Sequence, residues 1–141
     1  MKTLIYIIVV TILLALGIWH TAHATEIPEH QAIVALIGEA GGQGDEELLA
    51  HAYALKNRGT LKGVYGLHAK HTPNPTPEQW QRVEKAYWTA KLAFFDPLDG
   101  RTEWRSNYDL QKMKAKGQTP EKQGLYDPLR VGDTVFYRLK K

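Results

Sequence analysis

Residues 29–58 read EHQAIVALIGEAGGQGDEELLAHAYALKNR, and this stretch decides the fold. Its first part follows Pro28, which suits the start of a helix, and carries an apolar stripe of helical period up to the glycines from Gly41. Its second part opens at Asp45 with three consecutive acidic residues, which favour the positive end of a helix dipole. Arg58-Gly59 is a plausible helix end. The stretch therefore predicts two helices joined by a glycine-containing turn.

Outward from this stretch, the chain predicts one further helix and one strand. Thr76-Pro77-Glu78-Gln79 is a capping box with proline at the first helical position. The stripe that follows, which we expect in the core, consists of Trp80, Val83, Tyr87, Ala90 and Phe94. Asp96-Pro97 ends this helix. Beyond it, glycines and prolines predict loops, and only residues 134–139 read as a strand. We expect a mainly helical α+β domain with a small β element near the C-terminus.

Composition and charge narrow the classes of function. The chain has 141 residues, 43% hydrophobic, which suits a single domain. It has no cysteine, which excludes disulfides and thiolate metal sites. A net charge of +3 is too small to indicate a nucleic-acid partner. Residues 101–141 carry ten basic and five acidic side chains. This basic third is either a surface for anionic wall polymer or lipid, or an ordinary solvated surface.

The N-terminus predicts export. Lys2 precedes an uncharged, mostly apolar run over residues 4–19, and Thr21-Ala22-His23-Ala24 ends in a small-x-small pattern. We expect residues 1–24 to be a signal peptide and residues 25–141 to be the working domain. The alternative is an uncleaved anchor, which would be the only contact with a membrane. Either way, the domain is expected to be secreted, periplasmic or associated with the cell wall.

Glu39 is the leading candidate for chemistry. It falls at the end of the first predicted helix, on the same face as Ala32 and Leu36. Partial burial and the negative end of the helix dipole both favour a protonated carboxyl, which a general acid requires. Its small neighbours leave room for a bulky polymer. The alternative is a glutamate that frays into solvent.

A wider pattern resembles the SleB/CwlJ-type cell wall hydrolase family. The pattern runs from Gly38-Glu39-Ala40 through the glycine turn, the acidic helix start and alternating alanines to Asn57-Arg58. Weaker echoes follow in the same order at residues 61–64, 96–104 and 132–138, so the resemblance spans residues 31–138. The chain departs from the family at four places: Gly41 replaces the usual arginine, Glu47-Leu48 replaces Gly-Gln, Glu103 stands where histidine is common, and the stretch after Arg58 is shortened.

The resemblance implies a lysozyme-like fold that cleaves the β-1,4 bond between N-acetylmuramic acid and N-acetylglucosamine. It implies a lytic transglycosylase in which Glu39 acts as acid and then as base. A second carboxylate from Asp45, Asp96 or Glu103 would instead permit hydrolysis, and Glu103 is the first choice. The runner-up is a catalytically inactive peptidoglycan-binding or structural wall protein with the same fold.

Several other residues have two interpretations. Asn57 and its neighbour Arg58 match family positions, and we assign Asn57 to substrate binding on that ground. At a helix end, however, such residues more often tie the chain together than touch substrate. In the loop segment we assign Thr102, Glu103, Trp104 and Tyr108 to substrate binding, with burial of the aromatic rings as the alternative. Off the third helix's apolar stripe, two aromatic residues could line a groove; they are Trp88 and Phe95.

No motif in the sequence indicates a metal or another cofactor. The histidines at positions 51, 68 and 71 lack carboxylates at ligand spacing, so we expect neither a metal nor a cofactor. No phosphate-binding loop or serine nucleophile elbow is present in the sequence. We expect a monomer whose partners are peptidoglycan glycan strands.

Overall fold

A computed structural model of the chain describes residues 26–69 and 74–140. The elements are α2 (Glu29–Ala40), α3 (Asp45–Arg58), the 3-10 helix η1 (Tyr65–His68), α4 (Pro77–Leu92), β1 (Glu103–Ser106), α5 (Asn107–Ala115), the 3-10 helix η2 (Glu121–Gln123), β2 (Leu125–Val131) and β3 (Thr134–Leu139). Helices dominate the first part, and a three-stranded antiparallel sheet lies near the C-terminus, which confirms the α+β prediction. The predicted signal peptide lies outside the described residues.

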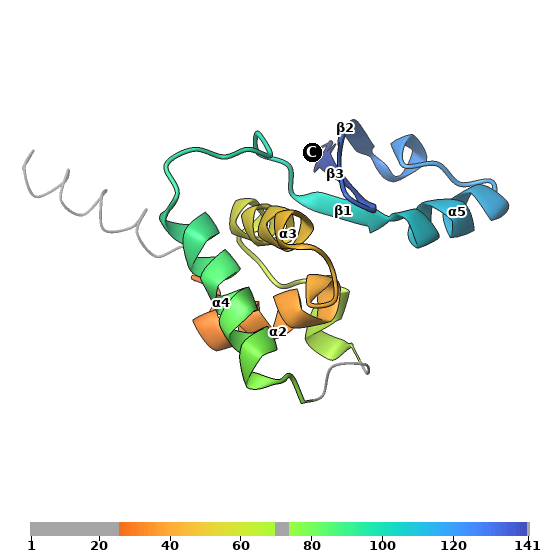
Figure 1. Cartoon of the computed structure of the whole chain (residues 1–141). Coiled ribbons are helices and arrows are strands. Elements are labelled where there is room, and N and C mark those ends of the chain that lie inside the picture. Colours follow the sequence, from red (N-terminus) through yellow and green to blue (C-terminus); the bar gives the residue numbers. More distant parts are fainter. Residues whose placement is uncertain (1–25, 70–73, 141) are drawn as a thin grey trace, which may run out of the picture.

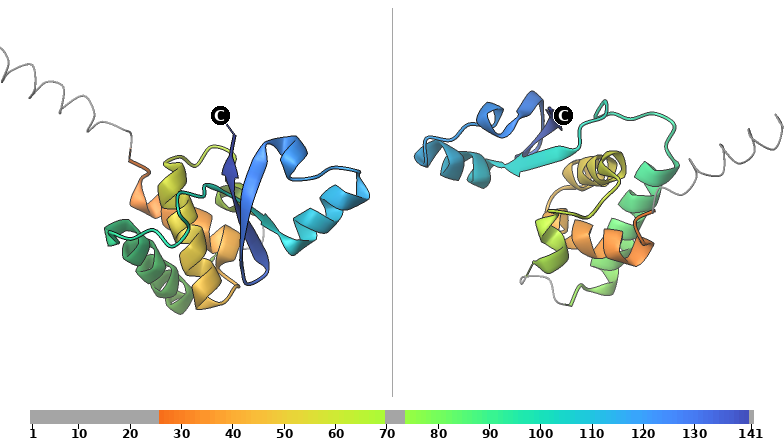
Figure 2. Two further views of the ribbon diagram at one scale, coloured as in Figure 1. Left: turned by 90° about the horizontal axis from the view of Figure 1, so that it is seen from above. Right: turned by 180° about the vertical axis from the view of Figure 1, so that it is seen from behind.

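The molecule has two parts that meet along α3 (Figure 1). We call α2, η1, α3 and α4 the helical part, and the three strands with α5 and η2 the sheet part. Figure 2 shows the same arrangement from above and from behind, with α5 extending away from the helices. The groove described below lies between these two parts.

The three long helices begin and end close to the predicted positions. Gly59 closes α3 in the left-handed conformation, with φ of 66°, which glycine adopts without steric cost. The Thr76 side chain accepts a hydrogen bond from the Gln79 backbone N–H at 3.1 Å, as an N-cap does. We expected Pro28 at the first helical position of α2. It is instead the N-cap residue, one position earlier. Local signals alone therefore locate the starts of all three helices, and the ends of α2 and α3, to within a residue or two.

The third predicted helix is shorter than expected. α4 ends at Leu92, and Phe94, which we expected in the core, is fully exposed. Trp80 is only half-buried, although it packs against the core. The apolar period continues past the point where the backbone leaves the helix, so periodicity overestimated this helix by two residues.

One hydrophobic core joins the two parts of the molecule. Its largest fully buried side chains come from several elements and include Ile33, Leu36, Leu48, Val83, Leu98 and Phe136. Phe136 belongs to β3, yet it lies among helical residues with no exposed surface. The next residues on either side, Val135 and Tyr137, form a smaller cluster with Leu125 and Leu110. Because side chains alternate across a strand, β3 faces the helices on one side and the α5 region on the other.

The sheet has the strand order β1-β3-β2. Trp104 of β1 pairs with Phe136 of β3, and β2 forms a hairpin with β3 across the Gly132-Asp133 turn. The pairing of β2 is irregular between Tyr126 and Leu129, and this irregularity contains Pro128. Proline is tolerated at such a bulge on an edge strand because no ladder hydrogen bond is required there. The prediction of loops over this segment was wrong for this reason.

The loop prediction was also wrong for β1 and α5. The side chains and backbones of Ser106 and Asp109 form a complete capping box at the start of α5. Ser-x-x-Asp was therefore a readable helix signal, but the helix has only nine residues and a single buried one, Met113. Its apolar pattern is too short to stand out from the loop-like flanks.

Two polar ties fix the sheet part on the helical part. Glu47, buried in the first turn of α3, accepts hydrogen bonds from the backbone N–H of Asp133 at 3.2 Å and the hydroxyl of Thr134 at 2.5 Å. A Cβ at Gly132 would lie 2.3 Å from the Glu47 carboxylate, so the turn needs glycine there. Glu47, which departs from the family pattern, thus has a structural role at the β2–β3 turn.

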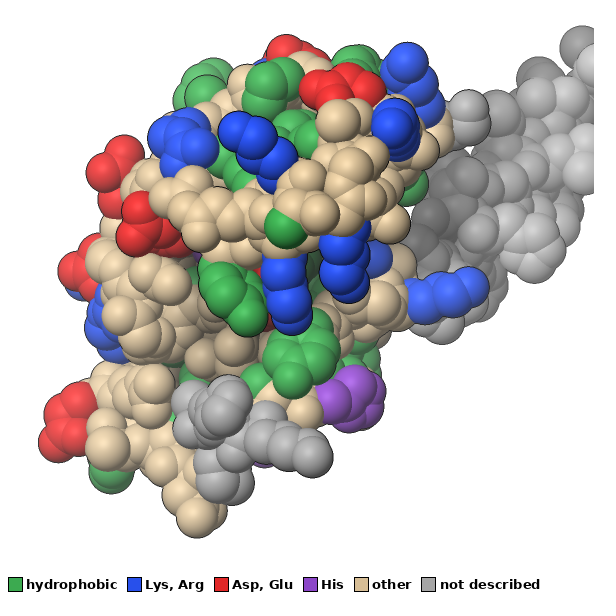
Figure 3. Space-filling view, turned by 90° about the vertical axis from the view of Figure 1, so that its right-hand side faces the viewer, with side chains coloured by type: hydrophobic (Ala, Val, Ile, Leu, Met, Phe, Trp, Pro, Cys, Tyr) green, Lys and Arg blue, Asp and Glu red, His purple; other side chains and the backbone are tan. Residues whose placement is uncertain are grey.

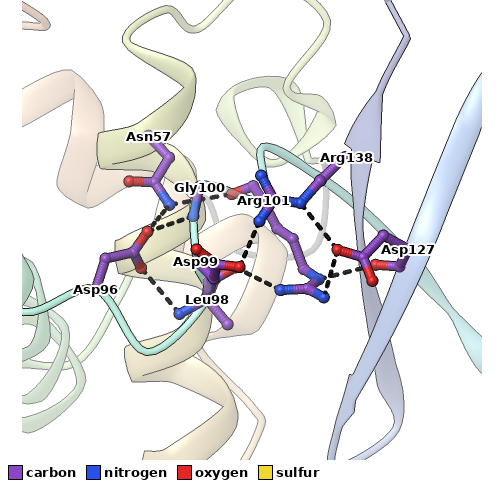
Figure 4. A network of polar contacts seen from close by, with 8 residues as sticks. All are labelled: Asn57, Asp96, Leu98, Asp99, Gly100, Arg101, Asp127 and Arg138. Carbon is purple, nitrogen blue, oxygen red and sulfur yellow. Dashed lines mark hydrogen bonds and ion pairs between the residues drawn. The ribbon is translucent and has the colours of Figure 1, made fainter.

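The second tie is the network in Figure 4. The buried Arg101 forms an ion pair with Asp127 of β2 at 2.9 Å and donates to the Leu98 carbonyl at 2.8 Å. Arg138 of β3 pairs with the same Asp127 carboxylate and with Asp99. The linker between α4 and β1 is therefore held against β2 and β3, and β1 leaves it in a fixed direction.

Candidate active site

A groove of about 720 Å³ lies between the helical part and the sheet part. Its lining residues come from the end of α2, the end of α3, η1, β1 and α5, and include Glu39, Arg58, Tyr65, Glu103, Trp104 and Tyr108. Figure 3 views the molecule from the α5 side, where Lys and Arg side chains and hydrophobic side chains gather around a hollow. Residues far apart in the sequence thus form one surface.

Glu39 lies in the last turn of α2, with its half-buried carboxylate lining the groove. One oxygen, Oε1, accepts a hydrogen bond from the Gly66 backbone N–H at 2.6 Å. The other, Oε2, accepts one from Trp104 Nε1 at 2.9 Å. Each carboxylate oxygen can accept more than one hydrogen bond, so both donors can position the group while an oxygen remains able to exchange a proton. The carboxylate is therefore held in one orientation.

Two glycines make this geometry sterically feasible. A Cβ at Gly38 would lie 2.1 Å from the Gly66 carbonyl oxygen, and a Cβ at Gly66 would lie 2.2 Å from the Ala35 carbonyl oxygen. Only residues without a side chain allow α2 and η1 to approach this closely. We expected the small neighbours of Glu39 to admit substrate. Gly38 instead admits η1, and this contact delivers the Gly66 N–H to the carboxylate.

Trp104 holds Glu39 from the sheet side. It lies on β1, and its ring contacts His51 of α3 edge-on, with 5.5 Å between ring centres. The Arg58 guanidinium lies 5.7 Å from the centre of the same indole, within the range of a cation–π contact. Trp104 is half-buried, so it both packs on the core and lines the groove. Burial, the alternative interpretation of this residue, describes part of its surroundings, and its assignment to substrate binding stays a prediction.

His51 is buried behind Trp104. Its Nδ1 lies 2.9 Å from the Glu47 carbonyl oxygen, and its ring also contacts Phe136 edge-on at 5.1 Å. Burial lowers the pKa of His51 below its ordinary value of 6.5, against the opposing charges of Glu39 and Glu47. The neutral ring thus belongs to the packed layer that supports Trp104.

The candidate second carboxylates lie in different surroundings. Glu103 lines the groove, and its Oε1 forms an ion pair with Arg58 at 2.7 Å. Asp45 is exposed and pairs with Arg82, away from this groove. Asp96 accepts hydrogen bonds from the backbone N–H groups of its own turn, which is a structural arrangement. Of these three, only Glu103 lines the groove with Glu39.

Two of the residues assigned to substrate binding do not line the groove. Asn57 donates to the Asp96 carboxylate at 2.9 Å and to the Arg101 carbonyl at 3.2 Å, as Figure 4 shows. The backbone of Thr102 pairs with the Tyr137 carbonyl at 3.1 Å. Both residues hold the segment that leads into β1. The structural alternative that the sequence left open for Asn57 describes its observed contacts.

The two other aromatic candidates are also outside the groove. Trp88 is half-buried, and its Nε1 donates to Glu29 at 3.1 Å. Phe95 is exposed on the segment after α4 and is absent from the groove lining. By contrast, the assigned residue Tyr108 lines the groove with 67% of its surface exposed.

Sequence reasoning missed several groove residues. Tyr65 is 69% exposed and lines the groove from η1. Gly66 supplies a donor to Glu39, which a sequence pattern does not reveal because the donor is a backbone group. From α5 and its flanks come Arg105, Lys112, Lys116 and Gln123. The only advance signal for these was the basic character of residues 101–141.

Neither a metal-binding cluster nor a membrane-spanning helix is found in the part of the chain that the structure describes. Over residues 26–69 and 74–140, no three His, Asp or Glu side chains gather in a metal-binding arrangement. His68 is exposed on η1, and His71 lies outside the described residues. No helix within the same ranges is long and apolar enough to span a bilayer.

No model of a known protein family matches this chain, and neither a curated protein nor a solved structure matches it at a significant level. The geometry of the groove and the sequence pattern are therefore the two indications of what the protein does.

Proposed function

We propose that this protein is a peptidoglycan glycosidase that cleaves the β-1,4 bond between N-acetylmuramic acid and N-acetylglucosamine, with Glu39 as the catalytic acid. One observation carries the proposal: a half-buried glutamate at a helix end opens into a groove of about 720 Å³ and is held by an N–H donor on each oxygen. A general acid must be fixed within hydrogen-bond reach of the leaving oxygen.

The groove walls support a sugar polymer as substrate. Tyr65 on η1 and Tyr108 on α5 are both largely exposed and line the same groove. Exposed aromatic faces pack well against the apolar faces of sugar rings. The lysozyme-like fold is part of the same proposal. It is supported by a helical part and a small antiparallel sheet that border one groove, with the acid at a helix end.

We further propose a lytic transglycosylase, in which one carboxylate suffices. The Glu39 carboxyl donates its proton to the glycosidic oxygen as the bond from the anomeric carbon to that oxygen breaks. The resulting carboxylate then accepts the proton of the sugar's 6-hydroxyl as that oxygen bonds to the anomeric carbon. The product is a 1,6-anhydro ring, and no water is consumed. The ion pair of Glu103 with Arg58 favours this scheme over a free second carboxylate.

The test is digestion of purified peptidoglycan, measured as the loss of turbidity of the suspension. Glu39→Gln should lower turnover by at least about a hundredfold, because proton transfer typically contributes 10²–10⁴-fold. Glu46→Gln is the matched control, since Glu46 is an exposed glutamate outside the groove lining. Mass spectrometry should find products one water lighter than those of hydrolysis.

Three outcomes would contradict parts of this proposal. Full turnover by Glu39→Gln would exclude Glu39 as the acid. Wild-type protein that pellets with peptidoglycan but never clears it would support the inactive wall-binding protein instead. Products with reducing ends, together with equal loss of turnover in Glu103→Gln, would support hydrolysis with Glu103 as the second carboxylate.

A further inference from the structure

The α5 side of the groove carries positive charge without ion-pair partners. Arg105, Lys112 and Lys116 all line the groove. None of the ion pairs found among residues 26–69 and 74–140 involves these three side chains. By contrast, the fourth cation of the lining, Arg58, is neutralised by Glu103 at 2.7 Å. We call Arg105, Lys112 and Lys116 the cationic wall.

The groove's own carboxylates are committed to other partners. Glu39 accepts the Gly66 and Trp104 N–H groups, and Glu103 is paired with Arg58. Asp109, on α5, accepts the Ser106 hydroxyl at 2.8 Å and the backbone N–H of the same residue. None of these carboxylates forms an ion pair with the cationic wall, so its three side chains can bind an anion from outside.

The wall residues are placed by regular structure. Tyr108, Lys112 and Lys116 are spaced by four residues, which puts them along one face of α5 and its C-cap. The Lys112 Nζ lies 5.2 Å from the Tyr108 ring centre. Arg105 is held by neutral acceptors, the Trp104 carbonyl at 2.7 Å and the Gln123 side-chain oxygen at 3.2 Å. These contacts orient the guanidinium and leave its charge uncompensated.

Arg105 also connects the wall to the candidate acid. Neighbouring side chains on β1 alternate between its faces, yet both Arg105 and Trp104 line the groove, and Trp104 donates to Glu39 at 2.9 Å. A glycan strand bound with a glycosidic oxygen at Glu39 would therefore pass along the cationic wall. A ligand that fills both places carries a glycosidic bond and a nearby negative charge.

We propose that the cationic wall is an anion subsite that binds carboxylates carried by the glycan strand. This inference rests on the proposed function and narrows its substrate class to anionic glycans. Two sources supply the same chemistry in peptidoglycan: the lactyl carboxylate of muramic acid in strands stripped of peptide, and the carboxylates of the stem peptides. A neutral polymer of N-acetylglucosamine lacks both. Because Lys112 and Lys116 are exposed and Arg105 is only half-buried, the attraction acts through solvent and weakens with salt.

The test measures binding to the Glu39→Gln protein, which holds the ligand without cleaving it. Three fluorescently labelled strands of equal length serve as probes: a neutral N-acetylglucosamine oligomer, a glycan strand stripped of peptide, and the same strand with its stem peptides. At low salt, at least one anionic strand should bind about tenfold more tightly than the neutral oligomer. The advantage should shrink as salt is added.

Variants then locate the effect on the wall. Lys112→Gln with Lys116→Gln should weaken binding of the anionic strand by about fivefold, as expected for two exposed charge contacts, and leave the neutral oligomer unchanged. The matched control is Lys114→Gln with Lys122→Gln, which removes the same charge from the same region outside the groove lining. Circular dichroism of each variant confirms folding.

The outcomes separate this inference from the proposed function. Tighter binding of the peptide-free strand alone assigns the subsite to the lactyl carboxylate, and tighter binding of the peptide-bearing strand alone assigns it to stem peptides. Tighter binding of both anionic strands shows that the cationic wall accepts either carboxylate. Equal binding of all three strands, no binding at all, or an equal loss in the control variant overturns the subsite. Turnover of peptidoglycan by wild-type protein is scored independently. A protein without turnover that still shows the wall-dependent preference loses the proposed enzymatic function and keeps the subsite.

Discussion

The helical part and the sheet part border the same groove but hold their groove residues in different ways. On the helical side, Glu39 is fixed by backbone contacts over a large core, including the close approach of Gly38 to Gly66. On the α5 side, the wall consists of two exposed lysines and the half-buried Arg105, and the hydrophobic cluster in this part, around Val135, is small. The difference suits two tasks, because proton transfer needs a fixed position whereas recognition of a flexible polymer tolerates adjustable contacts.

β3 is where the two parts can be compared most directly. Phe136 and Val135 are neighbours in sequence, but they point to opposite faces of the sheet and enter different clusters. A measured difference between them therefore reflects the size of the side chain removed and the cluster that it leaves, and not the strand that carries both residues. The following predictions use such neighbouring positions, from the largest expected effect to the smallest.

Phe136→Ala should have the largest effect on stability. Removal of a fully buried phenylalanine from the core shared by both parts should lower the free energy of unfolding by about 4 kcal/mol. Val135→Ala, on the opposite face, should lower the free energy of unfolding by about 2 kcal/mol. This substitution removes fewer carbon atoms, and it removes them from a smaller cluster. Chemical denaturation measures both. Equal losses would mean that the two clusters do not differ as the structure indicates.

Gly38→Ala tests the backbone contact behind Glu39. The new Cβ would meet the Gly66 carbonyl at 2.1 Å, so either α2 or η1 must move, at a cost of about 2 kcal/mol. Movement of η1 also withdraws the Gly66 N–H from Glu39, and turnover of peptidoglycan should fall more than stability alone explains. Gly42→Ala is the control, because its Cβ would have nothing within 4 Å. We expect it to change stability by less than about 0.5 kcal/mol. Wild-type activity and stability in Gly38→Ala would argue against the close packing.

The burial of His51, in the helical part, predicts that the free energy of unfolding depends on pH. Burial lowers the pKa of His51 in the folded protein, while the unfolded chain keeps a value near 6.5. In the interval between these values the unfolded chain binds more protons, so this contribution to stability is complete above about pH 7 and is lost as the pH falls below 6.5. The expected slope is at most about 1.4 kcal/mol per pH unit.

The measurement for His51 is the free energy of unfolding at pH 7 and pH 5, for wild type and for His51→Phe. Other groups titrate in both proteins, so the difference between them isolates the histidine. Wild type should lose more stability than the variant on acidification. An identical loss in both would show that His51 is not held neutral by its burial.

Local signals in the sequence predicted much of the helical part and little of the sheet part. Asp45, Gly59 and the Thr76 cap act through their own backbone neighbours, so their effect can be read from a few adjacent residues. β1 and β2 depend on pairing with β3, and the apolar pattern of each is short or interrupted by Pro128. Such strands are stabilised by contacts distant in sequence, which a local pattern does not contain.

The sequence by itself determined the starts of the three long helices, the last strand, the α+β class and the choice of Glu39 as the residue to examine. The tertiary structure decided what surrounds that carboxylate. The Gly66 amide, the Trp104 indole and the α5 cations come from segments 27 to 77 residues further along the chain, and only folding brings them to one groove. Helix caps and apolar stripes act over a few residues, whereas a groove is formed by packing between elements, and packing depends on the shape of every partner at once.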